Sequence, residues 1–318
     1  MEKNEKKLLS ILIPTYNRAS YLDNCLNSIF SQLDEELKNK IEIIVSNNAS
    51  TDNTEEIMKK YSQNMDVDYK YSSNLENLGF DGNFYKLHNE ASSLFCWILG
   101  DNEYLEKRSL KKIIEILEKN KDSGVIYISN KIKNKNLEQI TSNKFLEKVS
   151  YNITFISAII WKKDYQIELE YSEVKDSLFT QVFFYLNNLS KIEKNLIVYG
   201  KYFSSLEVGN GGYKLFEIFS NSFNRVLKKY HIDKKVVDKI NRDMCLSFFP
   251  IWILESKKQN KKTTFKQEDI YMTLKKIQAR YLYFWLIDFP ILKLNYYIGK
   301  MYYLPFKILL KIRRIINE

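Results

Sequence analysis

The sequence is poor in the residues that usually mark a disulfide framework, a zinc site or a catalytic triad. Its 318 residues include three cysteines, two histidines and four prolines. Cys25, Cys96 and Cys245 have neither paired nor metal-ligand spacing, which argues against disulfides and zinc and indicates a reducing compartment. His88 and His231 lie apart from any nucleophile or metal pattern. The sequence therefore gives no support to a disulfide-rich, zinc-dependent or triad-based protein.

Long uninterrupted apolar runs are also absent. The charged N-terminus, residues 1–7, leads straight into a predicted strand and offers no secretory signal. In the tail, residues 281–318, lysines interrupt every stretch of about 20 apolar residues that a membrane span would need. Pro290 and Pro305 are expected to break any helix there. These absences predict a cytoplasmic protein.

What remains is the composition of a basic globular protein. Hydrophobic residues make up 45% of the chain, and its length suffices for one large domain or two small ones. A formal net charge of +10 and an isoelectric point near 9.1 favour a polyanionic partner, such as nucleic acid, an anionic membrane or a phosphorylated substrate. Because the chain contains no recognised nucleic-acid-binding motif, nucleic acid is not a predicted partner.

Short apolar runs alternate with helical patterns over residues 1–130, which predicts βα units and a parallel sheet. Strands are expected near residues 8–13, 41–45, 67–71 and 94–99, and the helix before the last of them is expected to begin at about residue 84. The following part, 107–200, is mixed, with strands expected at 125–129 and 153–161 and a mobile loop over the site at 131–148. These patterns predict the α/β class.

Beyond Gly209-Asn210-Gly211-Gly212 the spacing of apolar residues is almost wholly helical. We therefore expect two parts, an α/β domain at 1–208 and a helical C-terminal region with a basic amphipathic tail at 209–318.

Three predicted strands end in polar loops that can bind a ligand. The first halts at Pro14–Arg18, the second at Ser46–Asp52, and the fourth at Gly100–Glu103, which carries two carboxylates. In an open α/β sheet such loops lie side by side at the carboxyl edge, where these folds bind ligands. The sequence therefore predicts a ligand site built from these three loops.

Four segments in this order, LLSILIPTYNRASYL, IIVSNNASTDNT, NLGFDGN and WILGDNEYL, resemble the nucleotide-sugar domain of family 2 glycosyltransferases with the GT-A fold. The resemblance covers about residues 8–200. It implies a Rossmann-like mixed sheet flanked by helices. It also implies a hexosyl- or N-acetylhexosaminyl-transferase that moves a sugar, with inversion, from a nucleotide-diphosphate donor such as a UDP-sugar. The implied acceptor is a hydroxyl of a bacterial surface glycan or a lipid-linked molecule.

The resemblance implies donor-binding roles for the first loop. Pro14, Thr15 and Tyr16 would line the base pocket, and Arg18 would lie near the phosphates. An aromatic ring such as that of Tyr16 can stack on a base without reading its identity. The alternative for this segment is a simple strand-to-helix turn, in which proline is common.

The second and third motifs are implied to complete the donor pocket. Family members usually carry an acidic pair where this chain has Asn47 and Asn48, and an amide oxygen at Asn48 can still accept a hydrogen bond from a uracil N–H. Asn77, Gly79 and Asn83 belong to a loop that the family places against the donor. Its alternative is an ordinary connecting turn.

Asp101 and Glu103 match the two ends of the family's Asp-x-Asp metal motif. The resemblance implies that Mg²⁺ or Mn²⁺ bridges these carboxylates to the diphosphate and neutralises charge on the departing nucleotide. Glu103 would be the direct ligand, and Asp101 would contact the ribose or a metal-bound water. Two solvated carboxylates at a helix start are the alternative.

The family also supplies a carboxylate base to the acceptor hydroxyl, often from a Glu-Asp pair at the start of a helix. The matching segment here implies Asp176 as the general base and Glu173 as the second candidate, with Lys175 interrupting the pair. A helix-capping aspartate is an equally good local interpretation. Because Asn48, Asn102 and Glu103 depart from the family pattern, a non-catalytic scaffold that retains the fold remains a second hypothesis.

The tail carries a repeat of positive charge. Lys293, Lys300, Lys307 and Arg314 recur at every seventh position, which returns them to nearly one face of a helix whose remainder is apolar or Tyr. Such a segment, residues 281–318, suits an anionic membrane surface at the inner face of the cell membrane. A helical bundle with solvated lysines is the alternative.

Overall fold

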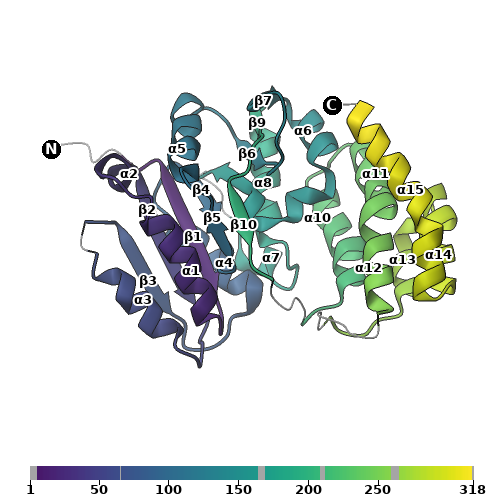
Figure 1. Cartoon of the computed structure of the whole chain (residues 1–318), viewed down its shortest axis with the longest axis horizontal. Coiled ribbons are helices and arrows are strands. Elements are labelled where there is room, and N and C mark those ends of the chain that lie inside the picture. The colour runs from purple at the N-terminus through teal and green to yellow at the C-terminus, as the bar shows by residue number, and fades with distance from the viewer. Residues whose placement is uncertain (1–5, 65, 164–168, 208–211, 259–264, 317–318) are drawn as a thin grey trace. The chain divides into compact units, whose positions relative to one another are not determined.

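The structure is a computed structural model that describes residues 6–64, 66–163, 169–207, 212–258 and 265–316 (Figure 1). The chain divides into two compact units, Met1–Val208 and Gly209–Glu318. Of the glycine cluster expected at the boundary, Gly209, Asn210 and Gly211 lie outside the described residues.

The described part of the C-terminal unit is helical. Its α-helices are α9 (Leu215–Glu217), α10 (Phe223–Lys229), α11 (Lys234–Asp243), α12 (Phe249–Ser256), α13 (Ile270–Gln278), α14 (Phe289–Lys293) and α15 (Tyr296–Ile316). Three π-helical segments join them: η3 (Ile218–Ser222), η4 (Met244–Phe248) and η5 (Phe284–Asp288). Within the described residues, no helix combines the length and apolar character that crossing a bilayer requires.

Two prolines of the tail lie within helical segments. Pro290 lies in the first turn of α14, which continues directly from η5, so the expected break does not occur there. Pro305 lies inside α15, so the expectation that it breaks the helix is wrong. Pro305 is exposed, and solvent can reach the carbonyl that would have accepted the missing N–H.

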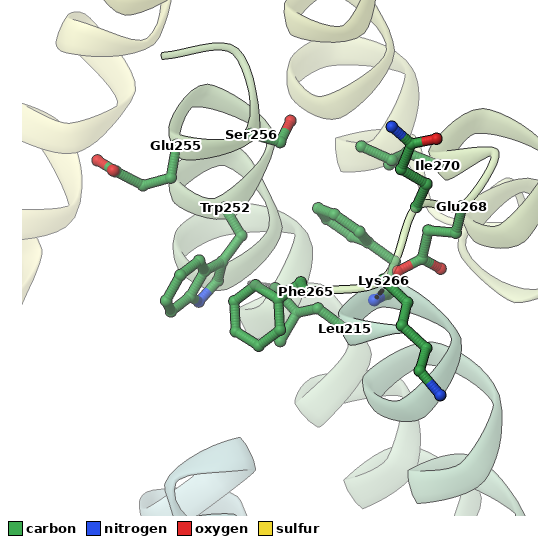
Figure 2. Close-up of a pocket in the computed structure, with 10 residues that line it drawn as sticks. Leu215, Trp252, Glu255, Ser256, Phe265, Lys266, Glu268 and Ile270 are labelled. Atoms are coloured by element: carbon green, nitrogen blue, oxygen red, sulfur yellow. Dashed lines mark hydrogen bonds between the residues drawn. The ribbon is translucent and has the colours of Figure 1, made fainter. Parts of the chain in front are cut away.

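A cavity with a volume of about 490 Å³ opens among the helices of this unit (Figure 2). The Trp252 and Phe265 rings meet edge to face beside it, with centroids 5.4 Å apart. The Glu268 carboxylate accepts hydrogen bonds from the backbone N–H groups of Phe216 and Glu217, at 2.8 and 2.9 Å. Glu268 thereby ties the segment before α13 to the start of α9.

The N-terminal unit is built on an eight-stranded mixed sheet in the order β3-β2-β1-β4-β8-β6-β9-β7. The strands are β1 (Leu9–Thr15), β2 (Ile41–Asn47), β3 (Tyr69–Ser73), β4 (Phe95–Ile98), β6 (Val125–Ile128), β7 (Leu137–Ile140), β8 (Ile159–Lys162) and β9 (Asn195–Val198). The first four are parallel, β8 runs antiparallel to β4 and β6, and β7 runs antiparallel to β9. The prediction of an α/β protein with a mixed sheet and a helical C-terminal region is confirmed.

Helices connect these strands and cover the sheet: α1 (Ala19–Phe30), α2 (Glu35–Lys40), α3 (Thr54–Ser62), α4 (Gly79–Glu90), α5 (Ser109–Lys119), α6 (Ser142–Val149), α7 (Tyr171–Val174) and α8 (Thr180–Lys191). A separate two-stranded sheet pairs β5 (Glu103–Leu105) with β10 (Phe203–Ser205). It matters for the site because β5 begins at one of the two predicted metal ligands.

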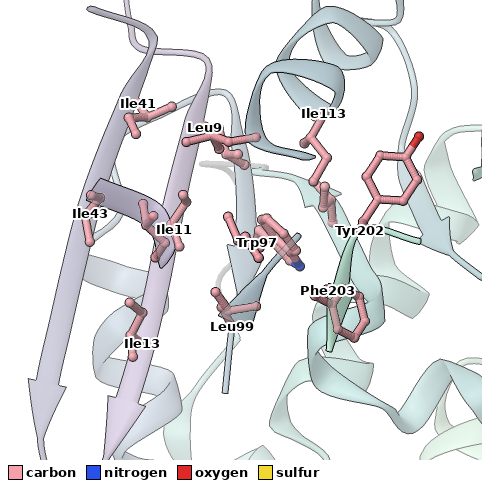
Figure 3. Close-up of a cluster of buried hydrophobic side chains, with 14 of the residues drawn as sticks. Leu9, Ile11, Ile13, Ile41, Ile43, Trp97, Leu99, Ile113, Tyr202 and Phe203 are labelled. Atoms are coloured by element: carbon pink, nitrogen blue, oxygen red, sulfur yellow. The ribbon is translucent and has the colours of Figure 1, made fainter. Parts of the chain in front are cut away.

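The core of this unit surrounds the central strands (Figure 3). Every residue of β2 is buried, and all of β1 except Pro14 is buried. Strands covered on both faces require continuous apolar runs rather than alternation, which is why the sequence shows LLSILI and IEIIV without a period of two. Trp97 from β4 and Phe203 from β10 extend the same core toward the small sheet.

Three expectations for this unit are wrong. Residues 131–148 do not form one mobile loop over the site, because they contain β7 and α6, and β7 is a polar edge strand paired with β9. Residues 150–158 form two 3₁₀ segments, so only the end of the expected strand at 153–161 is β8. Helix α4 begins at Gly79 rather than near residue 84, and the φ of +70° at Gly79 is one that other residues rarely adopt.

Candidate active site

The carboxyl ends of β1, β2 and β4 meet, as predicted, and bring the first and fourth motifs into contact. The Thr15 hydroxyl donates to Oδ2 of Asp101 at 2.9 Å, and Nη1 of Arg18 lies 3.0 Å from Oδ1 of the same carboxylate. Asp101 is 3% exposed. Burial raises the pKa of Asp101, and Arg18 and Thr15 act in the opposite direction. Asp101 is therefore a buried acid whose charge is balanced mainly by Arg18.

Glu103 lies beside Asp101 but is held by different groups. Its Oε2 accepts a hydrogen bond from the backbone N–H of Gly100 at 3.0 Å, and its Oε1 accepts one from the Ser205 hydroxyl at 3.4 Å. A Cβ at position 100 would lie 3.1 Å from Oε2, so glycine lets the carboxylate approach the backbone. Burial raises the pKa of Glu103 to about 8, and the nearby charge of Asp101 adds to this.

The pair of carboxylates, Asp101 and Glu103, does not by itself make a complete set of metal ligands. Within the ranges that the structure describes, no group of three or more His, Cys, Asp or Glu side chains is arranged to hold a metal ion. Two buried carboxylates nevertheless fit Mg²⁺ or Mn²⁺, because such ions usually take one or two protein carboxylates and complete their shell with water and substrate phosphates.

The first and second loops are fastened together. Oδ1 of Asn17 accepts from the N–H of Thr51 at 2.7 Å, and Asp52 accepts from the N–H of Ala19 at 3.0 Å. Tyr16 projects from this double loop with 44% of its surface exposed, and Pro14 is partly buried on β1. The Tyr16 ring is thus available for stacking, and its role as a base contact stays a prediction.

Asn48 is the most completely bonded residue of the second loop. Its Oδ1 accepts from Nδ2 of Asn74 and from the N–H of Leu78, at 3.0 and 2.9 Å. Its Nδ2 donates to Oδ1 of Asn77 and to the carbonyl of Gly79, at 2.8 and 3.2 Å. The amide therefore holds the 74–79 turn, and it could bond a base only by giving up one of these partners.

Asn83 and Asn77 also serve the scaffold of this pocket. Asn83 is buried, accepts from the Ser46 hydroxyl at 2.6 Å and donates to the Ser46 carbonyl at 3.1 Å. Asn77 bonds the N–H of Gly79 at 2.8 Å. The third motif, residues 77–83, does contact β2, through α4 and the turn before it. Its direct contact with a donor stays a prediction.

The two base candidates lie in and after α7, and both are exposed. Oε2 of Glu173 accepts from the backbone N–H of Glu170 at 3.1 Å and completes a capping box for α7. Asp176 follows this helix with a φ of +62°, in the segment before α8. Glu173 thus has a local structural use, whereas Asp176 does not begin α8 and caps no helix.

Sequence reasoning missed Asp81, a buried residue in the first turn of α4. Its carboxylate accepts hydrogen bonds from Leu178 and Thr180, next to Asp176. A usable signal existed, because Asp81 shares helical spacing with the buried Phe84 and His88. The signal was hidden by the assumption that residues 79–83 form a loop.

A family model described as Glycosyl transferase family 2 matches residues 10–185, more than half of the chain, and spans all the loops described above. The chain belongs to this family. The match covers both carboxylates of the buried pair and the segment that carries Asp176, so the GT-A resemblance noted in the sequence is confirmed.

Curated relatives of this family 2 member resemble it over limited regions. The abequosyltransferase RfbV of Salmonella typhimurium is 42% identical over 115 residues, which are 36% of this chain and 34% of that protein. The poly(ribitol-phosphate) β-N-acetylglucosaminyltransferase TarS of Staphylococcus aureus is 24% identical over 261 residues, 75% of this chain and 44% of TarS. The chain thus spans less than half the length of these relatives.

Solved structures agree on the fold. A crystal structure of S. aureus TarS residues 1–349 with UDP matches with a TM-score of 0.56 and 19% identity, over 77% of this chain and 78% of that one. The mannosyltransferase PcManGT from Pyrobaculum calidifontis, in complex with GDP-Man and Mn²⁺, matches with a TM-score of 0.50 and 14% identity, over 70% and 65%. These similarities show the GT-A fold of this chain.

Proposed function

We propose that the chain transfers a hexose or N-acetylhexosamine from a nucleoside-diphosphate sugar to a hydroxyl of a bacterial surface glycan or a lipid-linked acceptor, with inversion. The observation that carries the proposal is the convergence of Thr15, Arg18, Asp101 and Glu103 at the carboxyl edge of one sheet. A guanidinium beside two carboxylates can hold a diphosphate and a cation together. We assign this chemistry to residues 1–208.

A UDP-linked donor is the favoured choice. TarS, whose fold this chain shares, has been crystallised with UDP and with UDP-GlcNAc. The exposed Tyr16 ring offers a stacking surface for the base. The bonded state of Asn48 favours recognition of the base through the shape of the pocket and the backbone of the second loop, rather than through this side chain.

Asp101 and Glu103 would hold a Mg²⁺ or Mn²⁺ ion, with Glu103 as the direct ligand. When bound, the ion supplies Lewis-acid neutralisation of the diphosphate charge. The chain itself contributes a dry, pre-formed pair of carboxylates. Burial raises the pKa of both acids, so a cation beside them removes an electrostatic cost of keeping them ionised. Arg18, half-exposed at the rim, would move from Asp101 toward the phosphates.

Asp176 is the proposed general base. It is exposed and does not cap the adjacent helix, which leaves its carboxylate free to approach an acceptor hydroxyl. Inversion follows from a base that deprotonates the acceptor on the side opposite the leaving diphosphate.

Nucleotide binding tests the carboxyl pair. We expect isothermal titration calorimetry to detect UDP binding that strengthens with Mn²⁺ and weakens with EDTA. In Asp101→Asn the Mn²⁺-dependent gain should fall by at least about tenfold, because one charged partner of the cation is lost. Glu106→Gln is the matched control, since this partly buried acid near the pair bonds Lys201 and Ser204 instead.

Two results would count against the proposal. Equal UDP affinity with Mn²⁺ and EDTA, unchanged by Asp101→Asn, would remove the metal role. Metal-dependent UDP binding without release of UDP from any UDP-sugar in the presence of acceptor would favour the non-catalytic scaffold, which the Asn102 and Glu103 departures first suggested.

We further propose that the C-terminal unit rests on an anionic lipid surface. Residues 209–318 contain 22 Lys and Arg against 9 Asp and Glu, a net charge of +13, whereas residues 1–208 contain 27 against 30, a net charge of −3. No acidic residue occurs from Phe289 to Asn317. Charge concentrated in this way draws a surface toward anionic lipid.

Helix α15 supplies the apolar part of this surface. Its inward stripe consists of Gly299, Tyr303, Phe306 and Leu310. On the opposite side, large apolar side chains recur at helical spacing and are 46–77% exposed: Tyr297, Met301, Leu304, Ile308 and Ile312. Lys300, Lys307 and Lys311 are exposed along one edge of this outer stripe; Arg314 lies outside the described side chains. An apolar stripe edged by lysines suits a bilayer interface.

Vesicle binding tests this surface. The variant Lys300→Gln/Lys307→Gln/Lys311→Gln should bind phosphatidylglycerol–phosphatidylcholine vesicles about 100-fold more weakly than the wild type, since each lysine near such a surface contributes about 1 kcal/mol. Lys111→Gln/Lys112→Gln/Lys119→Gln, on exposed positions of α5, is the control for charge alone. Equal binding by both variants, or concentration-dependent dimerisation through α15, would refute the lipid assignment.

A further inference from the structure

The segment that carries Asp176 has an unusual backbone. Asp176 and Leu178 both adopt left-handed φ values, +62° and +56°. Side chains other than glycine rarely occupy this region, and a leucine there costs about 1–3 kcal/mol. Two such residues within three positions persist only if surrounding groups hold them. The contacts around this segment therefore decide where the Asp176 carboxylate lies.

Asp81 supplies those contacts from a distant helix. Its Oδ2 accepts the N–H of Leu178 at 2.9 Å. Its Oδ1 accepts the hydroxyl of Thr180 at 2.6 Å, the N–H of Thr180 at 3.3 Å and the hydroxyl of Ser177 at 3.4 Å. One carboxylate thus receives four hydrogen bonds from three residues of the 177–180 segment, and one of them fixes the left-handed Leu178.

The same carboxylate replaces a missing helix cap. The N-cap residue of α8, Phe179, has no side chain that can accept a hydrogen bond from the first turn. Asp81 accepts the first N–H of this helix from outside, where a negative charge also interacts favourably with the helix dipole. Asp81 is 4% exposed, and burial raises its pKa while the bonds from Thr180 and Leu178 oppose that rise.

The other side of Asp176 is anchored to the same helix. The hydroxyl of Tyr85 donates to the carbonyl of Leu169 at 2.7 Å, and the rings of Tyr85 and Tyr171 lie 5.5 Å apart. A Cβ at Gly82 would come within 3.1 Å of the Tyr171 hydroxyl, so α4 and α7 approach closely. Helix α4 therefore contacts the chain on both sides of Asp176: at Leu169 and Tyr171 before it, and at Leu178 and Thr180 after it.

We propose that Asp81 is a positioning residue for sugar transfer, which holds the 176–180 segment in the conformation that presents Asp176 to the acceptor. This inference rests on the proposed function, because it requires Asp176 to act as the base. Asp81 itself is buried and bonds the segment, so it would act on the reaction through the position of Asp176. Its effect is on the geometry of the reaction and not on donor affinity.

The variant Asp81→Asn tests the inference. Asparagine keeps one acceptor oxygen, but its NH₂ group cannot accept the bond from Thr180 or Leu178. We expect kcat to fall about 10- to 100-fold with the donor KM and UDP affinity unchanged, because a displacement of about 1 Å at a reacting group can cost that much. A merely structural loss would leave kcat per folded molecule unchanged.

A double-mutant cycle separates this inference from the proposed function. If Asp81 acts through Asp176, then Asp176→Asn should lower kcat much less in the Asp81→Asn background than in the wild type. Asp34→Ala is the stability control, since Asp34 caps α2 through Leu37 N–H at 2.9 Å, outside the site. It should lower stability and leave kcat unchanged.

The outcomes are distinct. A full loss of kcat in Asp176→Asn with normal kcat in Asp81→Asn, or additive losses, would overturn the role of Asp81. An active Asp176→Asn enzyme would instead overturn the proposed base. Should Asp81→Asn not fold, Thr180→Val removes only the 2.6 Å hydroxyl bond, and Thr180→Ser retains it. Reduced kcat in the valine variant alone supports the inference; equal kcat in both refutes it.

Discussion

Replacing Asp176 with asparagine is expected to lower kcat by about 10²- to 10⁴-fold while leaving UDP binding intact, because this is the range that a general base contributes. Asparagine is the suitable substitute, since it tolerates the left-handed φ of +62° that Asp176 adopts. The backbone and volume are kept, and only the proton acceptor is lost. The measurement is UDP release in the presence of acceptor, with calorimetry of UDP on the same sample.

Glu173→Gln is the matched control for this experiment. Glutamine can also complete the capping box at Glu170, so α7 should persist. We expect kcat within a small factor of the wild type. If Glu173→Gln loses activity and Asp176→Asn retains it, the base is Glu173 and the assignment is reversed; if both remain active, the proposed mechanism fails.

The largest effect on stability is expected at Glu42, a fully buried carboxylate in β2. It accepts hydrogen bonds from the Ser10, Ser92 and Ser93 hydroxyls and from the N–H groups of Ser92 and Ser93, and Nζ of Lys70 lies 3.0 Å away. Glu42→Gln replaces an acceptor oxygen with an NH₂ group that faces donors. We expect the free energy of unfolding in urea to fall by about 3–5 kcal/mol.

The pH dependence of Glu42 gives an independent check. Burial by itself raises the pKa of this carboxyl, but the hydrogen bonds from Ser10, Ser92 and Lys70 prevail and lower it from 4.5 to about 2. The stabilisation, about 3 kcal/mol, is therefore complete above pH 4.5 and is lost as the pH falls toward 2. Glu42→Gln should flatten the unfolding free energy over that interval.

Two controls limit the interpretation of the Glu42 experiment. Glu36→Gln removes an exposed ion pair with Lys40 and should change stability by less than about 1 kcal/mol. Lys70→Met removes a half-exposed partner of Glu42 and should lower the free energy of unfolding by little more than Glu36→Gln does. A loss at Glu42 no larger than at Glu36 would show that the buried serine cluster does not depend on its carboxylate.

The parallel half of the sheet could be predicted because its signal is local. Strands β1, β2 and β4 are apolar runs bounded by polar loops, and such runs need no knowledge of partners. Strand β7 could not be predicted in this way. Its sequence, LEQI, is polar because it lies at the edge of the sheet, and it becomes a strand only through pairing with β9.

In the candidate site too, residues marked by a local motif could be predicted, whereas residues defined by distant partners could not. Asp101 and Glu103 could be found because a motif marks them. The roles of Asn48 and Asp81 could not, because each is defined by partners far along the chain: Asn74 and Asn77 for the first, Leu178 and Thr180 for the second. Helical spacing could have shown that Asp81 is buried, but no sequence pattern shows what its carboxylate bonds.

The hydrogen bond between Glu103 and Ser205 joins residues 102 positions apart. At ordinary rates of translation, the ribosome delivers the second strand of the small sheet about 5–20 s after the first. During that interval β5 and its Glu103 have been synthesised, but β10 does not yet exist to pair with β5. A nascent chain of this length already has the first, second and fourth loops of the candidate site before it has β10, so the bond that Ser205 donates to Glu103 can form only after Ser205 has left the exit tunnel.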